Sequence, residues 1–195
     1  NQYLQALSML GMSGIGRNAS RVYIFGIAGS QDQPMLEGKN ILMKNYRVDS
    51  LREYVQYRMR QLDRQFEGKI VFYSPVTLKY QGELLHEFQI EALYRAALRR
   101  VYMLNCFEGN EMDERAYAIG LPYRIASQRV YQETVARYSN HKRQKMHLNG
   151  MIGTIELEED GFPENKELFL KIMLAGEILH IGKSTSFGFG RYRLR

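Results

Sequence analysis

The sequence predicts an α+β protein whose main part, residues 67–195, forms one antiparallel sheet with two helices on one of its faces. The first observation is the order of the predicted elements, which is strand, helix, strand, strand, helix and strand from Lys69 onward. The second is a glycine-rich segment, residues 182–190, between the last predicted helix and the last strand. This element order is typical of the ferredoxin-like βαββαβ arrangement, which RNA-recognition domains also use.

Residues 1–66 contain a shortened version of the same order of elements. Residues 1–10 are expected to end a helix, a glycine-containing loop follows, and the β-branched and aromatic residues 21–25 favour a strand. The tetrapeptide Gly-Ile-Gly-Arg at 14–17 matches Gly-Phe-Gly-Arg at 188–191 in pattern. The repeat indicates two related ferredoxin-like units, of which the first is partial.

The segment between the two units is predicted to contain a loop, a short strand over residues 41–46 and a helix. Ser50 and Glu53 have the spacing of a capping box, so the helix is expected to begin directly after Ser50. Its apolar residues fall on one side: Leu51, Val55, Met59, Leu62 and Phe66. Its arginines are expected on the other, solvated side: Arg52, Arg58, Arg60 and Arg64. We therefore expect residues 1–66 to be the tail of a first ferredoxin-like domain with a connecting helix, and residues 67–195 to be a C-terminal ferredoxin-like domain.

The second unit opens with a predicted strand over residues 69–80, in which one face is apolar. That face consists of Ile70, Phe72, Val76 and Leu78. Pro75 cannot donate a backbone hydrogen bond, so we expect a bulge or a sheet edge there. Gln81 and Gly82 turn the chain toward a helix over residues 87–107. The pattern then predicts strands at 128–138 and 146–158, a helix at 164–179 and a last strand at 189–194.

The composition indicates a basic protein with a sizeable core. The 195 residues are 45% hydrophobic, with a formal net charge of +6 and a pI of about 9.4, which favours nucleic acid as the partner. No apolar run approaches the length of a membrane span. The single cysteine, Cys106, lies in a predicted buried helix, so a disulfide within the chain is excluded and a reducing compartment fits. We therefore expect a cytoplasmic protein without a cofactor or a metal site.

The glycine-rich segment combines features that suit a phosphate chain. Backbone without Cβ atoms can approach a ligand closely, and oriented N–H groups form a concavity that binds anions. The segment supplies three glycines, three hydroxyls and two basic side chains: Gly182, Lys183, Ser184, Thr185, Ser186, Gly188, Gly190 and Arg191. It does not match a nucleotide-triphosphate loop, because Glu177 stands where that motif requires glycine. A simple turn before the last strand is the alternative interpretation.

Basic residues are also concentrated around residues 139–145, which are predicted to form the tip of a hairpin. The basic residues of this region are Arg124, Arg129, Arg137, Lys142, Arg143 and Lys145, against the single acid Glu133. Because the hairpin and the last strand are expected in one sheet, their basic side chains would form one continuous track for phosphates. Ordinary solvated charge is the alternative here.

Four segments, in this order along the chain, resemble the CRISPR-associated repeat-processing endoribonucleases of the RAMP superfamily. Residues 180–191 are similar to the glycine-rich signature of that family, and residues 74–78, Ser-Pro-Val-Thr-Leu, to its Thr-Pro strand. Residues 137–150 contain Arg-Tyr-Ser-Asn and Lys-Met-His-Leu-Asn-Gly, which resemble its basic hairpin with His147 in place of the usual proline. Residues 10–16 resemble the join between its two ferredoxin-like domains.

This resemblance implies cleavage of precursor CRISPR RNA within each repeat, without a metal ion. The ribose 2′-hydroxyl attacks the adjacent phosphate and leaves a 2′,3′-cyclic phosphate and a 5′-hydroxyl, with histidine acting as an acid or base in many members. The implied RNA-binding residues are Arg137, Lys142, Arg143, Lys145 and the glycine-rich segment. The implied partners are CRISPR repeat RNA and other CRISPR-associated proteins.

The catalytic residues are not assigned by the resemblance. In many members the catalytic histidine lies on the first helix of the first domain, a segment that is expected to be missing from this chain. Of the four histidines, His141 and His147 flank the basic tip and are the candidates for proton transfer, whereas His86 and His180 are expected at helix ends. Two other functions are open: an RNA-binding subunit without catalysis, and a ferredoxin-like assembly domain.

Overall fold

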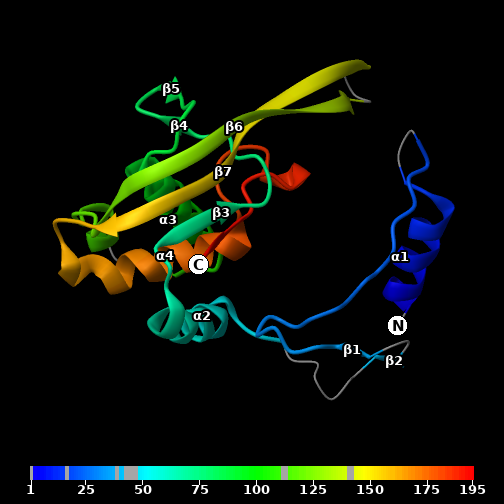
Figure 1. Ribbon diagram of the computed structural model, residues 1–195, viewed down its shortest axis with the longest axis horizontal. Helices are drawn as coiled ribbons and strands as arrows, with labels where there is room; N and C mark the ends of the chain where they lie inside the picture. Colours follow the sequence, from blue (N-terminus) through cyan, green and yellow to red (C-terminus); the bar gives the residue numbers. More distant parts are fainter. Residues whose placement is uncertain (1, 16–17, 38–39, 42–47, 111–113, 140–142) are drawn as a thin grey trace. The chain divides into compact units, whose positions relative to one another are not determined.

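The structure is a computed structural model, shown in Figure 1, that describes residues 2–15, 18–37, 40–41, 48–110, 114–139 and 143–195. It divides into two compact units, residues 1–50 and residues 51–195. No described helix is both long and apolar enough to cross a membrane.

The first unit contains a helix and a small hairpin. The helix, α1 (Gln2–Ser13), extends slightly beyond its predicted end. The hairpin pairs β1 (Leu36–Glu37) with β2 (Asn40–Ile41), and most of the strand predicted at 41–46 lies outside the described residues.

Residues 21–25 do not form the strand that their β-branched and aromatic side chains predicted. The N–H group of Val22 donates to the carbonyl of Gly11 in α1 (3.0 Å), so this backbone contacts a helix end instead of another strand. The side chains of Tyr23 and Phe25 are exposed. Residues with a high strand propensity form a strand only when a neighbouring strand is there to pair with. In the described part of this unit no strand lies beside residues 21–25, so they stay irregular.

The second unit is built on a four-stranded antiparallel sheet, as predicted (Figure 1). The strands are β3 (Lys69–Phe72), β6 (Tyr123–Ser139), β7 (Gln144–Glu159) and β8 (Tyr192–Leu194), in the order β6-β7-β3-β8. Three helices accompany it: α2 (Leu51–Gln65), α3 (Ile90–Phe107) and α4 (Lys166–Leu179). A minor hairpin, β4 (Lys79–Tyr80) with β5 (Glu83–Leu84), and the 3-10 turns η2 (Glu114–Tyr117), η3 (Pro163–Asn165) and η4 (Thr185–Phe187) complete the unit.

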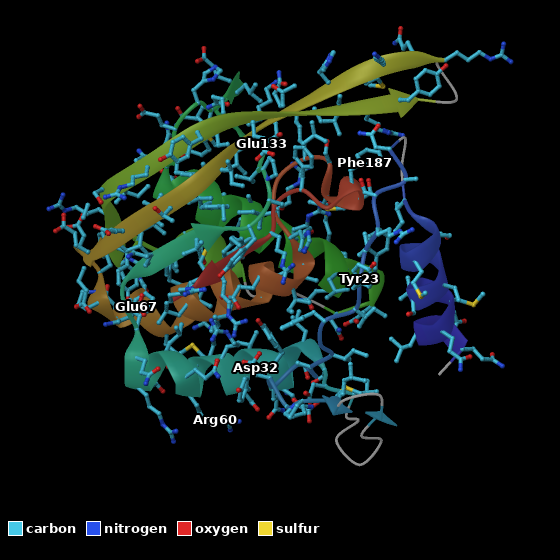
Figure 2. The ribbon with its side chains drawn as sticks, turned by 45° about the vertical axis from the view of Figure 1, so that its right-hand side comes forward. Tyr23, Asp32, Arg60, Glu67, Glu133 and Phe187 are labelled. Carbon is cyan, nitrogen blue, oxygen red and sulfur yellow. The ribbon has the colours of Figure 1, made fainter. Side chains whose placement is uncertain are left out.

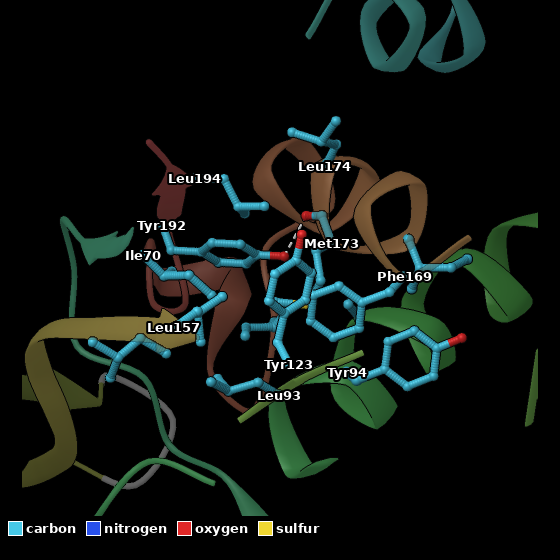
Figure 3. Packing of buried hydrophobic residues seen from close by; sticks show 14 of the residues in the cluster. Ile70, Leu93, Tyr94, Tyr123, Leu157, Phe169, Met173, Leu174, Tyr192 and Leu194 are labelled. Atoms are coloured by element: carbon cyan, nitrogen blue, oxygen red, sulfur yellow. Dashed lines mark hydrogen bonds between the residues drawn. The ribbon is translucent and has the colours of Figure 1, made fainter. Parts of the chain in front are cut away.

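The core lies between one face of the sheet and the helices α3 and α4. In register, Ile70 of β3 lies between Ile155 of β7 and Leu194 of β8, and all three side chains are almost fully buried. Figure 3 shows Ile70 and Leu194 in one core with Tyr94 of α3 and Phe169 of α4. The rings of Tyr94 and Phe169 stack with their centroids 5.5 Å apart. Both helices therefore cover the same face, and the ferredoxin-like prediction for this unit is confirmed.

The strand predicted at 69–80 is interrupted near Pro75, as expected from the missing N–H group. β3 ends at Phe72, and the chain then meets β7 at an isolated bridge between Val76 and Met151. The predicted apolar face is nevertheless buried along its whole length: Ile70, Phe72, Val76 and Leu78. This segment leaves the sheet but stays in the core, which places it next to the glycine-rich segment.

The helix α2 buries a side that includes an arginine, contrary to the prediction that Arg58 is solvated. Its buried residues are Tyr54, Arg58 and Leu62, one helical turn apart. Arg58 is 5% exposed, and its Nε lies 3.2 Å from Oε2 of Glu177 in α4. The predicted apolar side of α2 does pack against the core, with Leu62 buried and Val55, Met59 and Phe66 half-buried against it. Arg58 shares this interface because a buried carboxylate on α4 stabilises it there.

Glu177 connects α2, α4 and β8. It accepts hydrogen bonds from the Tyr54 hydroxyl (2.7 Å) and from the Leu194 N–H (2.6 Å), and Arg58 in turn donates to the Leu194 carbonyl (2.7 Å). Burial raises the pKa of Tyr54, and the neighbouring Glu177 carboxylate raises it further. The hydroxyl therefore keeps its proton and donates a hydrogen bond to Glu177. The N–H and C=O groups of Leu194 point away from β3, and both are hydrogen bonded to these side chains.

The boundary between the two units falls between Ser50 and Leu51. This helix was predicted to connect residues 1–66 to the C-terminal domain, but α2 packs on α4 and belongs to the second unit. The interpretation of the first segment as the tail of another ferredoxin-like domain stays a prediction.

Cys106 is exposed, so the prediction of a buried cysteine is wrong. It lies in the last turn of α3, where the side chains of Met103 and Phe107 are also exposed. The buried residues of this helix, such as Leu93 and Ala97, lie in its first half, where α3 meets α4. The apolar character of the last turn therefore does not correspond to burial.

Candidate nucleic-acid interface

The glycine-rich loop, residues 180–191, connects α4 to β8 and requires its three glycines for different reasons. Gly182, Gly188 and Gly190 all have positive φ, of 79°, 83° and 79°. A side chain at Gly182 or Gly190 would collide with a neighbouring carbonyl oxygen, whereas the space beside Gly188 is open. The first and third glycines thus allow the loop to pack, and the second leaves an unobstructed surface.

Several amides of the glycine-rich loop hold the loop in place. The N–H of Lys183 donates to the carbonyl of Thr77 (2.9 Å), and the N–H of Gly190 donates to the carbonyl of Pro75 (2.8 Å). These donors face the segment after β3 and not a ligand. The exposed residues of the loop are Lys183, Ser186, Phe187, Gly188 and Arg191, whereas Ser184 and Thr185 are partly buried. We therefore expect side chains, more than backbone amides, to meet a phosphate here.

The basic hairpin formed by β6 and β7 contacts the glycine-rich loop. The guanidinium carbon of Arg137 on β6 lies 3.9 Å from the ring centroid of Phe187, a cation–π geometry. Figure 2 shows Phe187 beside the hairpin. Two regions that are 50 positions apart in the sequence, and that the sequence analysis selected separately, are therefore adjacent in the second unit.

The hairpin presents its predicted site residues on two opposite faces. Arg137 is opposite Met146, whereas Lys145 is opposite Tyr138 one residue along, so the side chains of Arg137 and Lys145 point to different faces. His147 is exposed and shares the face of Lys145. Only Arg137 of these residues lies toward the glycine-rich loop.

The hairpin tip carries the remaining basic residues of this region. Arg143 is exposed, with a positive φ of 49° that belongs to the turn between β6 and β7. His141 and Lys142 lie outside the described residues. The position of Arg143 and Lys145 beyond the core leaves them accessible to a large polyanion.

Replacing Lys142, Arg143 and Lys145 together with Ala is expected to weaken RNA binding and to flatten its salt dependence. Each phosphate contact with single-stranded RNA contributes about 0.7 to the slope of log affinity against log salt, so the slope should fall by about 2. The measurement is a salt titration of binding to labelled repeat RNA. A matched control replaces Arg52, Lys166 and Lys171, which also removes three charges, and an equal change in both variants would contradict the assignment.

The sheet does not form the continuous basic track that the sequence analysis expected. The hairpin and the last strand do belong to one sheet, but β3 lies between β7 of the hairpin and β8. On the face away from the helices, Arg129 of β6 and Arg193 of β8 lie in one cross-strand row with Thr154 and Val71 between them. At roughly 4.8 Å per strand, the two arginines start about 14 Å apart. The basic residues therefore form separate groups at the two sides of the sheet.

Arginines of α3 that the sequence analysis did not select lie against the glycine-rich loop. Arg100 donates to the Thr185 hydroxyl and to the Gly182 carbonyl (3.4 Å). A groove of about 520 Å³ runs between α3 and the segment after β3. Its basic lining residues are Lys79, Arg95, Arg99, Arg100 and Lys183. Arg95 is paired with Glu91 (2.8 Å), which leaves the other four to give the groove a positive charge.

The sequence did contain a signal for this groove. Arg95 and Arg99 lie one turn apart on the exposed side of α3, away from Leu93 and Ala97. Arg100 follows seven positions after Leu93, so it lies near the buried side and is half-buried. No function was predicted for them from the sequence, because an exposed arginine on a helix is usually solvated. Only the packing of Arg100 against the glycine-rich loop distinguishes these arginines from ordinary solvated ones.

The described histidines do not form a catalytic pair. The Nδ1 of His180 lies 3.1 Å from the carbonyl of Phe189, so this ring contributes to the loop structure. Neither His180 nor exposed His147 has a carboxylate partner recorded within the described part of the chain. Nor do any three His, Cys, Asp or Glu side chains among the described residues come together as a possible metal site.

Comparison with protein families finds one match, which covers most of the second unit. Residues 70–192 match the family described as CRISPR-associated endoribonuclease Cas6. This range contains the interrupted strand, the hairpin and the glycine-rich loop. A search of curated proteins found no match.

Solved structures support the fold. A Cas6 product complex from Thermus thermophilus is 13% identical, with a TM-score of 0.56 over 99% of this chain and 70% of that chain. A partial Cas6-RT-Cas1–Cas2 complex is 12% identical, with a TM-score of 0.55 over 85% of this chain and 28% of that chain. A second Cas6-RT-Cas1–Cas2 complex has the same identity and TM-score, and this chain covers 18% of it. The chain thus spans less than a third of the proteins in these two complexes.

Proposed function

Because this chain belongs to the family of the CRISPR-associated endoribonuclease Cas6, we propose that it binds CRISPR repeat RNA as part of a metal-independent endoribonuclease. The contact between Arg137 and Phe187 supports this proposal independently of the family match. It joins the basic hairpin to the glycine-rich loop, so one RNA can meet both. The α3 groove beside Gly182 and Thr185 enlarges the same basic surface.

The loop and the hairpin would act in binding and orientation. Lys183, Arg191 and the exposed hairpin tip supply positive charge for phosphates, and the open space beside Gly188 allows the RNA backbone to approach. The exposed ring of Phe187 offers a surface on which a base can stack.

The proposed reaction is an internal transfer at the scissile phosphate. The 2′-oxygen forms a bond to phosphorus, the bond from phosphorus to the 5′-oxygen breaks, and the product ends in a 2′,3′-cyclic phosphate. A general base takes the proton of the 2′-hydroxyl, and a general acid protonates the leaving 5′-oxygen. We do not assign these two roles to described residues, since His147 and Arg137 lie on opposite faces of the hairpin.

We further propose that residues 1–50 are the tail of a first ferredoxin-like domain whose preceding part carries the catalytic histidine. The exposed, β-branched and aromatic residues 21–25 support this, because they have the composition of a strand without a neighbouring strand to pair with in the described unit. A longer protein that contains the preceding segment should therefore have these residues in a sheet.

The chain alone is expected to bind repeat RNA weakly and to cut it poorly, whereas a longer protein with the preceding segment should cut it in EDTA. The measurement is a cleavage assay on labelled repeat RNA for both proteins, with and without chelator, with identification of the cyclic phosphate. Loss of cutting in EDTA would overturn the metal-independent mechanism. Strong cutting by this chain alone would place the catalytic residues within it, with His141 and His147 the first to be replaced.

The same assay separates the alternative functions. A subunit that holds CRISPR RNA without cutting it, together with other CRISPR-associated proteins, would bind with a steep salt dependence but release no cyclic phosphate. An assembly domain would show neither. The Cas6-RT-Cas1–Cas2 complexes among the similar structures are the reason to keep protein partners in the proposal.

A further inference from the structure

A second basic concavity lies between α2 and β8, and none of its lining residues belongs to the glycine-rich loop, residues 180–191. It has a volume of about 600 Å³. Its polar lining includes Tyr57, Arg60, Arg64, Tyr73, Arg193 and Arg195. Figure 2 shows Arg60 on α2 and Glu67 in the turn that follows this helix. We call this concavity the α2–β8 cleft.

The α2–β8 cleft has an excess of positive charge. Arg58 also lines it, but the buried Glu177 carboxylate neutralises that guanidinium. The remaining lining contains four arginines and one acid, Glu67. A concave site with such a charge excess attracts anions more strongly than scattered surface charges do.

Two tyrosines lie among these arginines. The ring of Tyr73 is 45% exposed; its hydroxyl accepts a hydrogen bond from Arg195 (2.6 Å), and the Arg191 guanidinium lies 5.8 Å from its centroid. Tyr57 accepts a hydrogen bond from Gln61 (2.7 Å). Aromatic rings beside basic groups are the combination with which proteins hold unpaired bases and their phosphates.

The two walls of the cleft are fixed relative to each other. Arg58 on α2 donates to the Leu194 carbonyl in β8, and Glu177 binds both elements. The arginines on α2 and on β8 are therefore held at a constant separation. A preformed site loses less conformational entropy when a ligand binds.

We propose that the α2–β8 cleft binds an unpaired stretch of RNA, separately from the hairpin and the glycine-rich loop. This inference rests on the proposed RNA-binding function. Phosphates would contact Arg64 from one wall and Arg193 from the other, and a base would stack on Tyr73. A cleft of this volume admits a splayed nucleotide, whereas a base-paired helix keeps its base faces stacked and presents only its backbone.

The test replaces one arginine from each wall, in the variant Arg64→Gln/Arg193→Gln. The control variant, Arg52→Gln/Lys171→Gln, removes the same charge from α2 and α4 outside the cleft. Binding of a short labelled oligouridine and of a fully base-paired RNA is measured over a range of salt concentrations. Thermal unfolding of each variant checks that the second unit is folded.

The cleft variant is expected to lower the salt slope for oligouridine by about 1.4, corresponding to two phosphate contacts, with little change for paired RNA. The control variant should keep the wild-type slope for both. Equal slopes for the cleft variant and the control would overturn the cleft, and the proposed function would stand if the Ala variant of Lys142, Arg143 and Lys145 still lowers the slope for repeat RNA. Absence of any RNA binding by the wild-type chain and by the longer protein would overturn both. A cleft variant that fails to unfold cooperatively is replaced by Tyr73→Leu, for which weaker oligouridine binding is expected and unchanged binding overturns the proposal.

Discussion

Replacing Gly188 with Asp is expected to abolish RNA binding while the second unit stays folded. Apart from its two chain neighbours, no described residue has an atom within 4 Å of a Cβ atom at this position, so the new side chain extends into the space where a phosphate would approach. The φ of 83° disfavours most side chains, but Asp and Asn tolerate this region better than others. Two negative charges about 4 Å apart repel by roughly 1 kcal/mol in water and 4 kcal/mol near a protein surface. The measurement is binding of labelled repeat RNA, with thermal unfolding alongside.

The matched control for this variant is Gly188→Asn. Asn has nearly the same volume and the same backbone demands, but it carries no charge. Retained binding by Asn with loss by Asp would identify charge repulsion as the cause, and equal losses would identify steric exclusion. If both variants bind as well as the wild type, the glycine-rich loop does not approach the RNA at Gly188.

Replacing Arg58 with Met is expected to destabilise the second unit by about 3 kcal/mol. Removing one partner of a buried ion pair leaves the other charge uncompensated, which lowers the free energy of unfolding by roughly 3–5 kcal/mol. We expect the lower end because Glu177 keeps its hydrogen bonds from Tyr54 and Leu194. For a unit of this size the midpoint of thermal unfolding should fall by roughly 6 to 12 °C.

The double variant Arg58→Met/Glu177→Gln provides the control. Gln keeps an acceptor for the Leu194 N–H but removes the buried charge, so part of the lost stability should return. Urea unfolding of the wild type, both single variants and the double variant gives the coupling between the two side chains. A loss below about 1 kcal/mol for Arg58→Met would mean that the pair is solvated in solution.

Much of the second unit could be predicted because its patterns are local. Alternation over residues 69–72, the break near Pro75 and the helical spacing of α3 each depend on a few neighbouring residues, and all three match the structure. The errors occurred where a distant element decides the outcome. Arg58 is buried because Glu177 lies opposite it, and residues 21–25 lack a strand because no partner lies beside them in the described part of the unit.

The candidate site was predictable as a set of segments but not as a surface. The glycine pattern and the basic hairpin could be selected from the sequence, since each is continuous along the chain. Their meeting at Arg137 and Phe187 depends on how far β6 extends past the core, which no local pattern encodes. The participation of Arg100 follows from the packing of α3 against the glycine-rich loop, and the roles of these residues in RNA binding stay predictions.

The hydrogen bonds around Leu194 also determine where another chain could extend the sheet. β8 is an edge strand, and edge strands usually offer free N–H and C=O groups to which a foreign strand can be added. At Leu194 those groups are already bonded to Glu177 and Arg58, so strand addition along β8 would have to break a buried ion pair. The opposite edge, β6, is long and pairs on one side with β7. Any β-augmentation of this sheet by a partner protein is therefore directed to β6, on the side of the molecule that carries the basic hairpin.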